Sequence, residues 1–185
     1  MYLRIQPYEA TVLGITFRNI QKMTKNTEIK LDATDIALLG ALQRNARTTL
    51  AELAEHVSIS ASTCQRRMAR LEESGLIEGY TVLLDEDRLG YDGSVIVQIT
   101  LNAQSEAALT TFEAAVVDIP ELVECHLMAG EADYLLRLVV RDMRDFERIH
   151  KMHLSRLPHV ARLQSNMALR RVVRKPPPVP HPKTA

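Results

Sequence analysis

Three arginines, Arg66, Arg67 and Arg70, lie close together in the segment from Ser60 to Leu71, which contains no acidic residue. Guanidinium groups make bidentate hydrogen bonds to guanine and also bind phosphate oxygens. Small hydroxyl side chains precede the arginines and can reach the same groups. This combination is typical of a DNA-reading surface. A row of arginines is also compatible with an ordinary solvated surface, so the surrounding segments have to decide between the two.

The spacing of apolar residues predicts that a helix positions these arginines. Ser60 is a suitable N-cap, because its hydroxyl can accept a free backbone N–H of the first turn. Gly75 is a suitable end, because the residue after a helix often adopts a positive φ. Cys64, Met68 and Leu71 recur at i, i+4 and i+7, which indicates a buried stripe. The arginines therefore fall on the opposite face and its flank.

The preceding segment predicts a second, shorter helix. Thr49 and Glu52 have capping-box spacing. An apolar face follows, made of Leu50, Leu53, Ala54 and Val57. A turn at Ser58-Ile59 then leads into the arginine helix, and two short amphipathic helices so joined indicate a helix-turn-helix motif. We expect DNA contacts from Thr49, Ser60, Ser62, Thr63, Gln65, Arg66, Arg67 and Arg70.

Composition limits the class of protein. The chain has 185 residues, 46% of them hydrophobic, and a formal net charge of zero, so any basic character is local. Two cysteines without a CxxC pair or a secretory signal indicate free thiols in a reducing compartment. No apolar run approaches the ~20 residues of a membrane span. We expect a cytoplasmic, nucleoid-associated protein without a membrane partner.

Helix caps and shifts in composition predict the domain organisation. Asp32-Ala-Thr-Asp35 is expected to cap a first helix, which ends near Asn45 and has Ile36, Leu39 and Leu42 on one face. Leu76–Leu84 is rich in apolar, β-branched and aromatic residues and resembles a wing strand. The expected divisions are an N-terminal extension over 1–30, a winged helix-turn-helix over 31–84, a linker over 85–93, a second domain over 94–173 and a basic, Pro-rich tail over 174–185. Residues 1–22 are either an upstream extension before a start at Met23 or a genuine arm that packs or binds DNA.

The second domain alternates between strand and helix patterns. Val95 to Leu101, Leu122 to Ala129, Tyr134 to Val140 and Val160 to Leu169 read as strands, and Glu106–Ile119 and Met143–Leu157 read as helices. The resulting βαββαβ order predicts a ferredoxin-like sandwich, so the whole chain is α+β. Residues on the bare face of its sheet are interpreted as largely apolar. A second copy is therefore expected to cover that face.

Several motifs, in fixed order from about residue 30 to 173, resemble the Lrp/AsnC family of transcriptional regulators. They are Leu31-Asp-Ala-Thr-Asp35, Leu50-Ala-Glu-Leu-Ala54, Cys64-Gln-Arg-Arg67, Leu71-Glu-Glu-Ser-Gly-Leu-Ile77, Gly79-Tyr80, Pro120-Glu-Leu-Val-Glu-Cys-His126, Gly130-Glu-Ala-Asp-Tyr-Leu-Leu136, Val140-Arg-Asp-Met143 and Leu157-Pro158. The resemblance implies sequence-specific binding to double-stranded DNA, homodimers that can assemble into octamers, and a small effector, usually an amino acid, bound between sandwich domains of neighbouring dimers. The N-terminal segment, the Pro-rich tail and Glu131-Ala132 in the glycine loop depart from the family pattern.

The glycine loop is the expected effector site. Gly130 permits a positive φ and close backbone approach, and free loop N–H groups can receive a carboxylate. Asp133 can pair with an ammonium group, or it can merely cap the turn into Tyr134. The expected effector-binding residues are Gly130, Glu131, Ala132, Asp133, Tyr134 and Ser165.

Histidines leave an enzymatic alternative open. Sirohaem decarboxylases resemble this family and use histidines in the sandwich half, where this chain has His126, His150 and His153. Such an enzyme does not need the arginine face. His150 and His153, with Glu147, lie one turn apart on a helix, but a structural role is favoured over metal binding. We therefore expect no catalytic residue, no metal and no cofactor beyond the effector.

Overall fold

A computed structural model describes residues 29–179, which form two compact units. Of the described residues, one unit contains 29–82 together with 175–179, and the other spans Leu83–Arg174. The hypotheses about residues 1–22, including the choice between Met1 and Met23 as the start, lie outside the described residues. So does the end of the tail, from residue 180.

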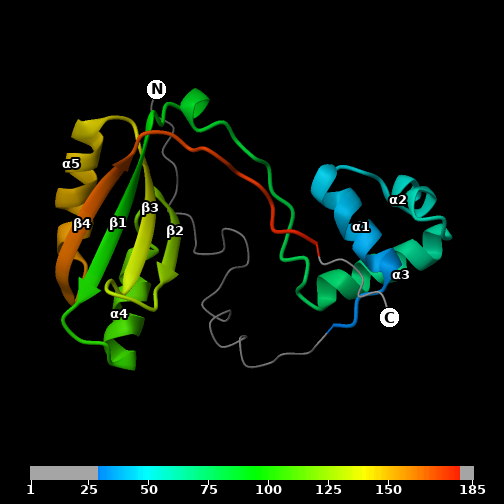
Figure 1. The fold of residues 1–185 in the computed structure, drawn as a ribbon, viewed down its shortest axis with the longest axis horizontal. Coiled ribbons are helices and arrows are strands. Elements are labelled where there is room, and N and C mark those ends of the chain that lie inside the picture. Colours follow the sequence, from blue (N-terminus) through cyan, green and yellow to red (C-terminus); the bar gives the residue numbers. More distant parts are fainter. Residues whose placement is uncertain (1–28, 180–185) are drawn as a thin grey trace, which may run out of the picture. The chain divides into compact units, whose positions relative to one another are not determined.

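The first unit contains three helices, α1 (Ala33–Arg44), α2 (Leu50–His56) and α3 (Ala61–Glu73) (Figure 1). All three predicted caps are present: Asp32 and Thr49 form capping boxes, and the Ser60 hydroxyl accepts the Thr63 N–H. The predicted buried stripe of α3 is confirmed, because Cys64, Met68 and Leu71 lie in the core. That core also contains Leu38, Ala41, Leu53 and Ala54.

Two details of this core differ from the prediction. Leu38 and Ala41 form the centre of the buried face of α1, while Ile36, Leu39 and Leu42 are only half-buried. Asp35 shares this buried face and is hydrogen-bonded to Arg70 of α3, so the face packed on the other helices is centred on Asp35, Leu38 and Ala41. Leu50, expected on the apolar face of α2, is exposed in the first turn of that helix.

The predicted wing strand at Leu76–Leu84 is wrong. Residues 78–85 form neither helix nor strand, and Tyr80, Val82, Leu83 and Leu84 are exposed. A β-branched, aromatic composition favours extended backbone, but a strand also needs a neighbour to complete its hydrogen-bond ladder. No strand of the described residues pairs with this segment. Tyr80 instead donates its hydroxyl to Glu72 at the end of α3, at 2.8 Å.

The second unit has the predicted βαββαβ order. Its elements are β1 (Gly93–Leu101), α4 (Glu106–Val116), β2 (Leu122–Leu127), β3 (Tyr134–Val140), α5 (Met143–Met152) and β4 (Val160–Ala168). The strands form one antiparallel sheet in the order β2-β3-β1-β4. Both predicted helices end earlier than expected, at Val116 and Met152, and a 3-10 turn at Leu154–Arg156 follows α5. The connection before β1 also contains a 3-10 turn, Asp87–Leu89.

Helices α4 and α5 cover one face of this sheet (Figure 1). Val95, Val97, Ile99 and Leu101 of β1 point into that core, as their alternation predicts. The other face was expected to be largely apolar, and this expectation is wrong. The strand register shows which residues point to this open face, and most of them are polar or charged. They are Glu124, His126, Ser94, Ile96, Gln98, Thr100, Leu135, Arg137, Val139, Arg162, Gln164, Asn166 and Ala168.

None of the described helices is both long and apolar enough to cross a membrane.

Candidate nucleic-acid interface and effector site

The outward face of α3 presents a short polar row. Ser62, Gln65 and Arg66 are exposed, and their spacing of three and four residues puts them on the face opposite the buried stripe. Arg66 makes no hydrogen bond or ion pair with any other residue that the structure describes. Within residues 29–179, nothing occupies its guanidinium, which can bind a group outside the chain.

The hydroxyl residues before this row serve the helix start. Ser60 donates its hydroxyl to Thr63 Oγ1 at 2.8 Å, and the Ser62 hydroxyl lies 3.2 Å from Ser60 Oγ. Thr49 caps the start of α2, where its hydroxyl and its backbone N–H both donate to the Glu52 carboxylate. These bonds from Thr49 hold the pKa of the Glu52 carboxyl below its usual range. Thr49, Ser60 and Thr63 thus have structural partners, and the exposed Ser62 belongs to the outward row.

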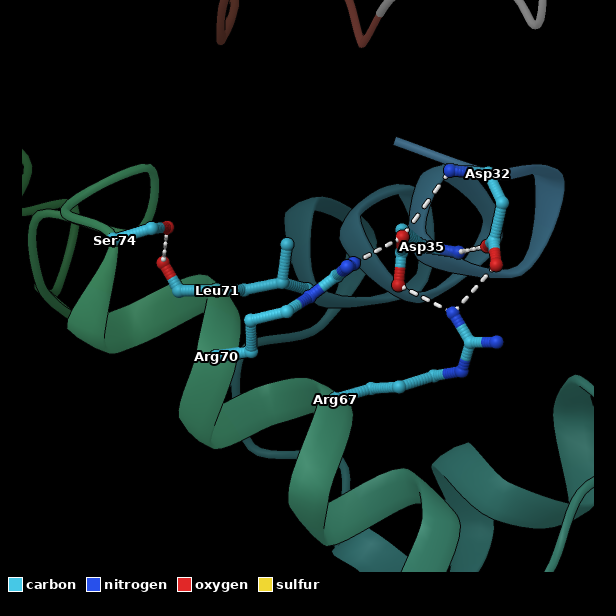
Figure 2. Close-up of polar contacts among 6 residues, drawn as sticks. All are labelled: Asp32, Asp35, Arg67, Arg70, Leu71 and Ser74. Carbon is cyan, nitrogen blue, oxygen red and sulfur yellow. Dashed lines mark hydrogen bonds and ion pairs between the residues drawn. The ribbon is translucent and has the colours of Figure 1, made fainter. Parts of the chain in front are cut away.

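Arg67 and Arg70 turn away from the row toward α1 (Figure 2). Arg67 Nη1 donates to Asp32 Oδ2 at 2.7 Å and to Asp35 Oδ1 at 2.8 Å. Arg70 Nη2 donates to Asp35 Oδ2, which also accepts the Asp32 N–H at 3.1 Å. The two arginines expected on the DNA side therefore have intramolecular acidic partners.

The charged groups in this cluster stabilise one another's ionised forms. Bonds from the Asp35 N–H and from Arg67 hold the pKa of the Asp32 carboxyl below its usual range. Bonds to Asp32 and Asp35 in turn raise the pKa of the Arg67 guanidinium. The Asp35 side chain is 0% exposed, whereas those of Arg67 and Arg70 are 26% and 49% exposed. A buried carboxylate is stable only when it is paired and hydrogen-bonded, so both arginines also serve the fold.

The predicted effector loop, Gly130–Asp133, connects β2 to β3. Asp133 lies buried at its end, where its carboxylate accepts the Leu101 N–H and the Gln104 side-chain amide, each at 2.7 Å. Both carboxylate oxygens therefore have partners inside the unit, and Asp133 ties the loop to the end of β1. Gly130 does not have a positive φ, and an added Cβ would meet no heavy atom within 4 Å, so neither expected glycine property appears.

A small hollow adjoins this loop on the open face of the sheet. It has a volume of about 40 Å³ and is lined by Glu131, Ala132, Gln98, Thr100, Arg162 and Gln164. Ser165 is in register with the inward-pointing Val97, so it points to the opposite face. Tyr134 is a core residue that packs on Phe112 and donates its hydroxyl to Glu113. The structure thus brings only Glu131 and Ala132 of the predicted residues to the hollow.

Two sequence families match the chain in the order of its two units. A model described as winged helix-turn-helix DNA-binding matches residues 31–78, and the Lrp/AsnC ligand binding domain matches residues 94–178. A proline dehydrogenase transcriptional activator of Rhodobacter capsulatus is 41% identical over 143 residues, which cover 77% of this chain and 93% of that protein. The chain belongs to the Lrp/AsnC family.

Further relatives agree with this assignment. The Bkd operon transcriptional regulator of Pseudomonas aeruginosa is 38% identical over 151 residues, covering 81% of this chain and 99% of that protein. A transcriptional regulator of Neisseria meningitidis, solved in complex with L-Met, is 32% identical with a TM-score of 0.73, covering 79% of this chain and 94% of that one. The chain is therefore a DNA-binding transcriptional regulator with a ligand-binding domain.

Sequence reasoning missed four polar residues of this Lrp/AsnC regulator that line the hollow, Gln98, Thr100, Arg162 and Gln164. The available signal was strand alternation, because each lies next to an apolar residue that points into the core. The acidic partners of Arg67 and Arg70 were also missed. Asp32 and Asp35 were interpreted only as a helix cap, and they lie more than 30 residues from the arginines in sequence.

Of the histidines considered for an enzyme, His126 is separated by the sheet from His150 in α5 and from His153, the C-cap of that helix. His126 points to the open face of the sheet, where it lies 3.5 Å from Glu124, whereas His150 is on α5 against the other face. Among the described residues, no group of three or more His, Cys, Asp or Glu side chains could hold a metal ion. Cys125 points inward, opposite to His126, and burial raises the pKa of its thiol to about 11. No pair formed by Cys125 and His126 is available for nucleophilic catalysis.

Proposed function

We propose that this regulator reads operator DNA with the exposed row of α3, formed by Ser62, Gln65 and Arg66, and that a small amino acid bound in the second unit modulates the binding. The observation that carries the proposal is the exposed Arg66 guanidinium, which has no partner in the described part of the chain, on a helix whose opposite face is packed into the core. A helix docks in the major groove with one face against the bases and the other against its own domain.

The chemistry of the row suits base recognition. Arginine binds the O6 and N7 of guanine with two parallel hydrogen bonds, and glutamine binds the N6 and N7 of adenine in the same way. Because the formal net charge is zero, attraction to phosphate depends on local surfaces rather than on the whole molecule. The proposal places the protein in the compartment that contains the chromosome.

The test compares two variants with the same change of charge. Arg66→Gln should weaken binding to the operator by about 1–3 kcal/mol, roughly 5- to 150-fold, and relax the preference for one base pair. Arg144→Gln removes an exposed arginine from α5 in the other unit and serves as the control. Fluorescence anisotropy with operator and unrelated DNA gives both affinities. Operator binding by Arg66→Gln that equals binding by Arg144→Gln would refute the α3 assignment.

The loop and the polar hollow support an amino-acid effector. Among the described residues, the N–H groups of Gly130, Glu131 and Ala132 have no hydrogen-bond partner, so they are available to a carboxylate. The Glu131 side chain is 95% exposed and lies 3.7 Å from the Arg162 guanidinium, in a weak surface pair that an ammonium group of the ligand could replace. Relatives named leucine-responsive regulatory proteins and the L-Met complex are consistent with this ligand class.

The hollow is too small to enclose an amino acid within one chain. We propose that a second copy of the regulator completes the site and that homodimers, with further assembly toward octamers, are the active form. The polar character of the open sheet face is compatible with such a contact, because interfaces carry polar groups in about the same share as other surfaces.

A thermal-shift screen of the common amino acids tests the effector proposal. An effector at a hundredfold excess over its Kd stabilises the folded protein by about 2.7 kcal/mol. Gln164→Ala, in the hollow, should remove the shift, while Ser165→Ala, on the opposite face, should retain it. A shift lost in Ser165→Ala and retained in Gln164→Ala would place the effector elsewhere, and the absence of any shift at millimolar concentration would reject this ligand class.

A further inference from the structure

The three arginines of α3 have different surroundings, although they stand within five residues of one another. Arg66 points outward without a partner among the described residues. Arg67 bridges two acids of α1, and Arg70 binds the second of these (Figure 2). The acids belong to the N-terminal turn of α1, where Asp32 is the N-cap and Asp35 completes the capping box.

Asp35 is the centre of this cluster. Its side chain is completely buried, and its two oxygens accept bonds from Arg67, Arg70 and the Asp32 N–H. A buried charge without its partner is strongly destabilising, because it has given up its hydration without compensation. If Arg67 and Arg70 both moved to DNA phosphates, Asp35 would be left in that condition, and the departure of either one would remove part of its compensation. An exposed phosphate contact gains less, because both groups remain largely in water.

We propose that Asp35 is a positioning residue that withholds Arg67 and Arg70 from DNA, so that Arg66 supplies the arginine contact of α3. The inference rests on the proposed function, because it takes α3 as the reading helix. Asp35 has two effects. It fixes the reading helix against α1, and it prevents two cationic side chains from strengthening binding to every sequence alike. A regulator gains specificity when sequence-independent attraction is kept low.

The test measures operator and unrelated DNA binding over a range of salt concentrations for the full chain and for Arg66→Gln, Arg67→Gln and Arg70→Gln. Removal of one arginine that binds a phosphate should reduce the slope of log K against log salt by about 0.9. We expect Arg67→Gln and Arg70→Gln to retain the wild-type slope and the wild-type ratio of operator to unrelated binding. Arg66→Gln should lower that ratio by roughly 5- to 150-fold. A slope reduced by about 0.9 per protomer in Arg67→Gln or Arg70→Gln would overturn the inference.

Arg70→Gln keeps the test decisive if Arg67→Gln does not fold. Arg70 is half exposed and makes one bond, so its removal leaves Asp35 paired with Arg67. If instead Arg66→Gln equals the wild type in every measurement, the α3 proposal itself fails, and this outcome is distinct from failure of the Asp35 assignment.

Asp35→Asn gives a readout that a merely structural residue would not change. The amide removes the negative charge while keeping the size of the side chain, so Arg70 becomes free to reach phosphate. We expect a lower melting temperature and, in the folded protein, tighter binding to unrelated DNA with a slope steeper by about 0.9 for each arginine released. Folded Asp35→Asn with an unchanged slope would contradict the withholding role. If this variant does not fold, the slope of Arg70→Gln decides.

Discussion

Asp133 connects the effector loop to the end of β1, because its carboxylate accepts the Leu101 N–H and the Gln104 amide. Asp133→Ala would leave the buried Leu101 N–H without a partner, so we expect it to destabilise the second unit by about 1–3 kcal/mol. Urea denaturation followed by circular dichroism measures this. Glu131→Ala, an exposed change in the same loop, should alter stability by less than about 0.5 kcal/mol. Equal stabilities of the two variants would show that the bonds of Asp133 are dispensable. A lost effector response in Asp133→Ala therefore does not place this side chain on the ligand.

At the same scale, the sequence predicted which α3 residues are exposed but not what they bind. Helical spacing separates Arg66 from the buried stripe, because periodicity is a local property. The pairing of Arg67 and Arg70 with Asp35 depends on how α1 and α3 pack, and no local pattern reports it. The position of Ser165 relative to the loop likewise depends on the register of β4 with β1, which no local pattern reports.

Elements with local signals were predicted well. The caps at Asp32, Thr49 and Ser60 are formed with residues only one helical turn away, so the sequence alone contains both partners. Gly75 has the expected positive φ after α3. The wing at Leu76–Leu84 needed a second strand, and its composition could not supply one. Helix ends at Val116 and Met152 were missed because apolar periodicity continues past them into turns that still pack on the core.

On the scale of the whole molecule, a charged substitution should have different effects on the two faces of the sheet, even at adjacent residues. Ile96 lies on the open face, whereas Val97 is buried under the helices. If the open face joins two copies, Ile96→Asp should yield a folded monomer, because a charge enters the interface without entering the core. Val97→Asp should instead unfold the second unit. Light scattering and circular dichroism distinguish these outcomes. A wild-type chain that scatters as a monomer, or Ile96→Asp that remains dimeric, would mean that copies meet elsewhere.

The connector at residues 78–85, which forms neither helix nor strand, has a consequence for affinity. In a dimer joined through the sheets, this connector and the chain crossing at Arg174 and Lys175 tether each reading unit to the same body. Once the first unit is bound, the second searches a small volume, at an effective concentration in the millimolar range for short linkers. Avidity then supplies the affinity that a single α3 lacks when, among the described residues, only Arg66 of its arginines has no acidic partner. Two weak half-sites can be bound tightly together, and either one alone is released quickly.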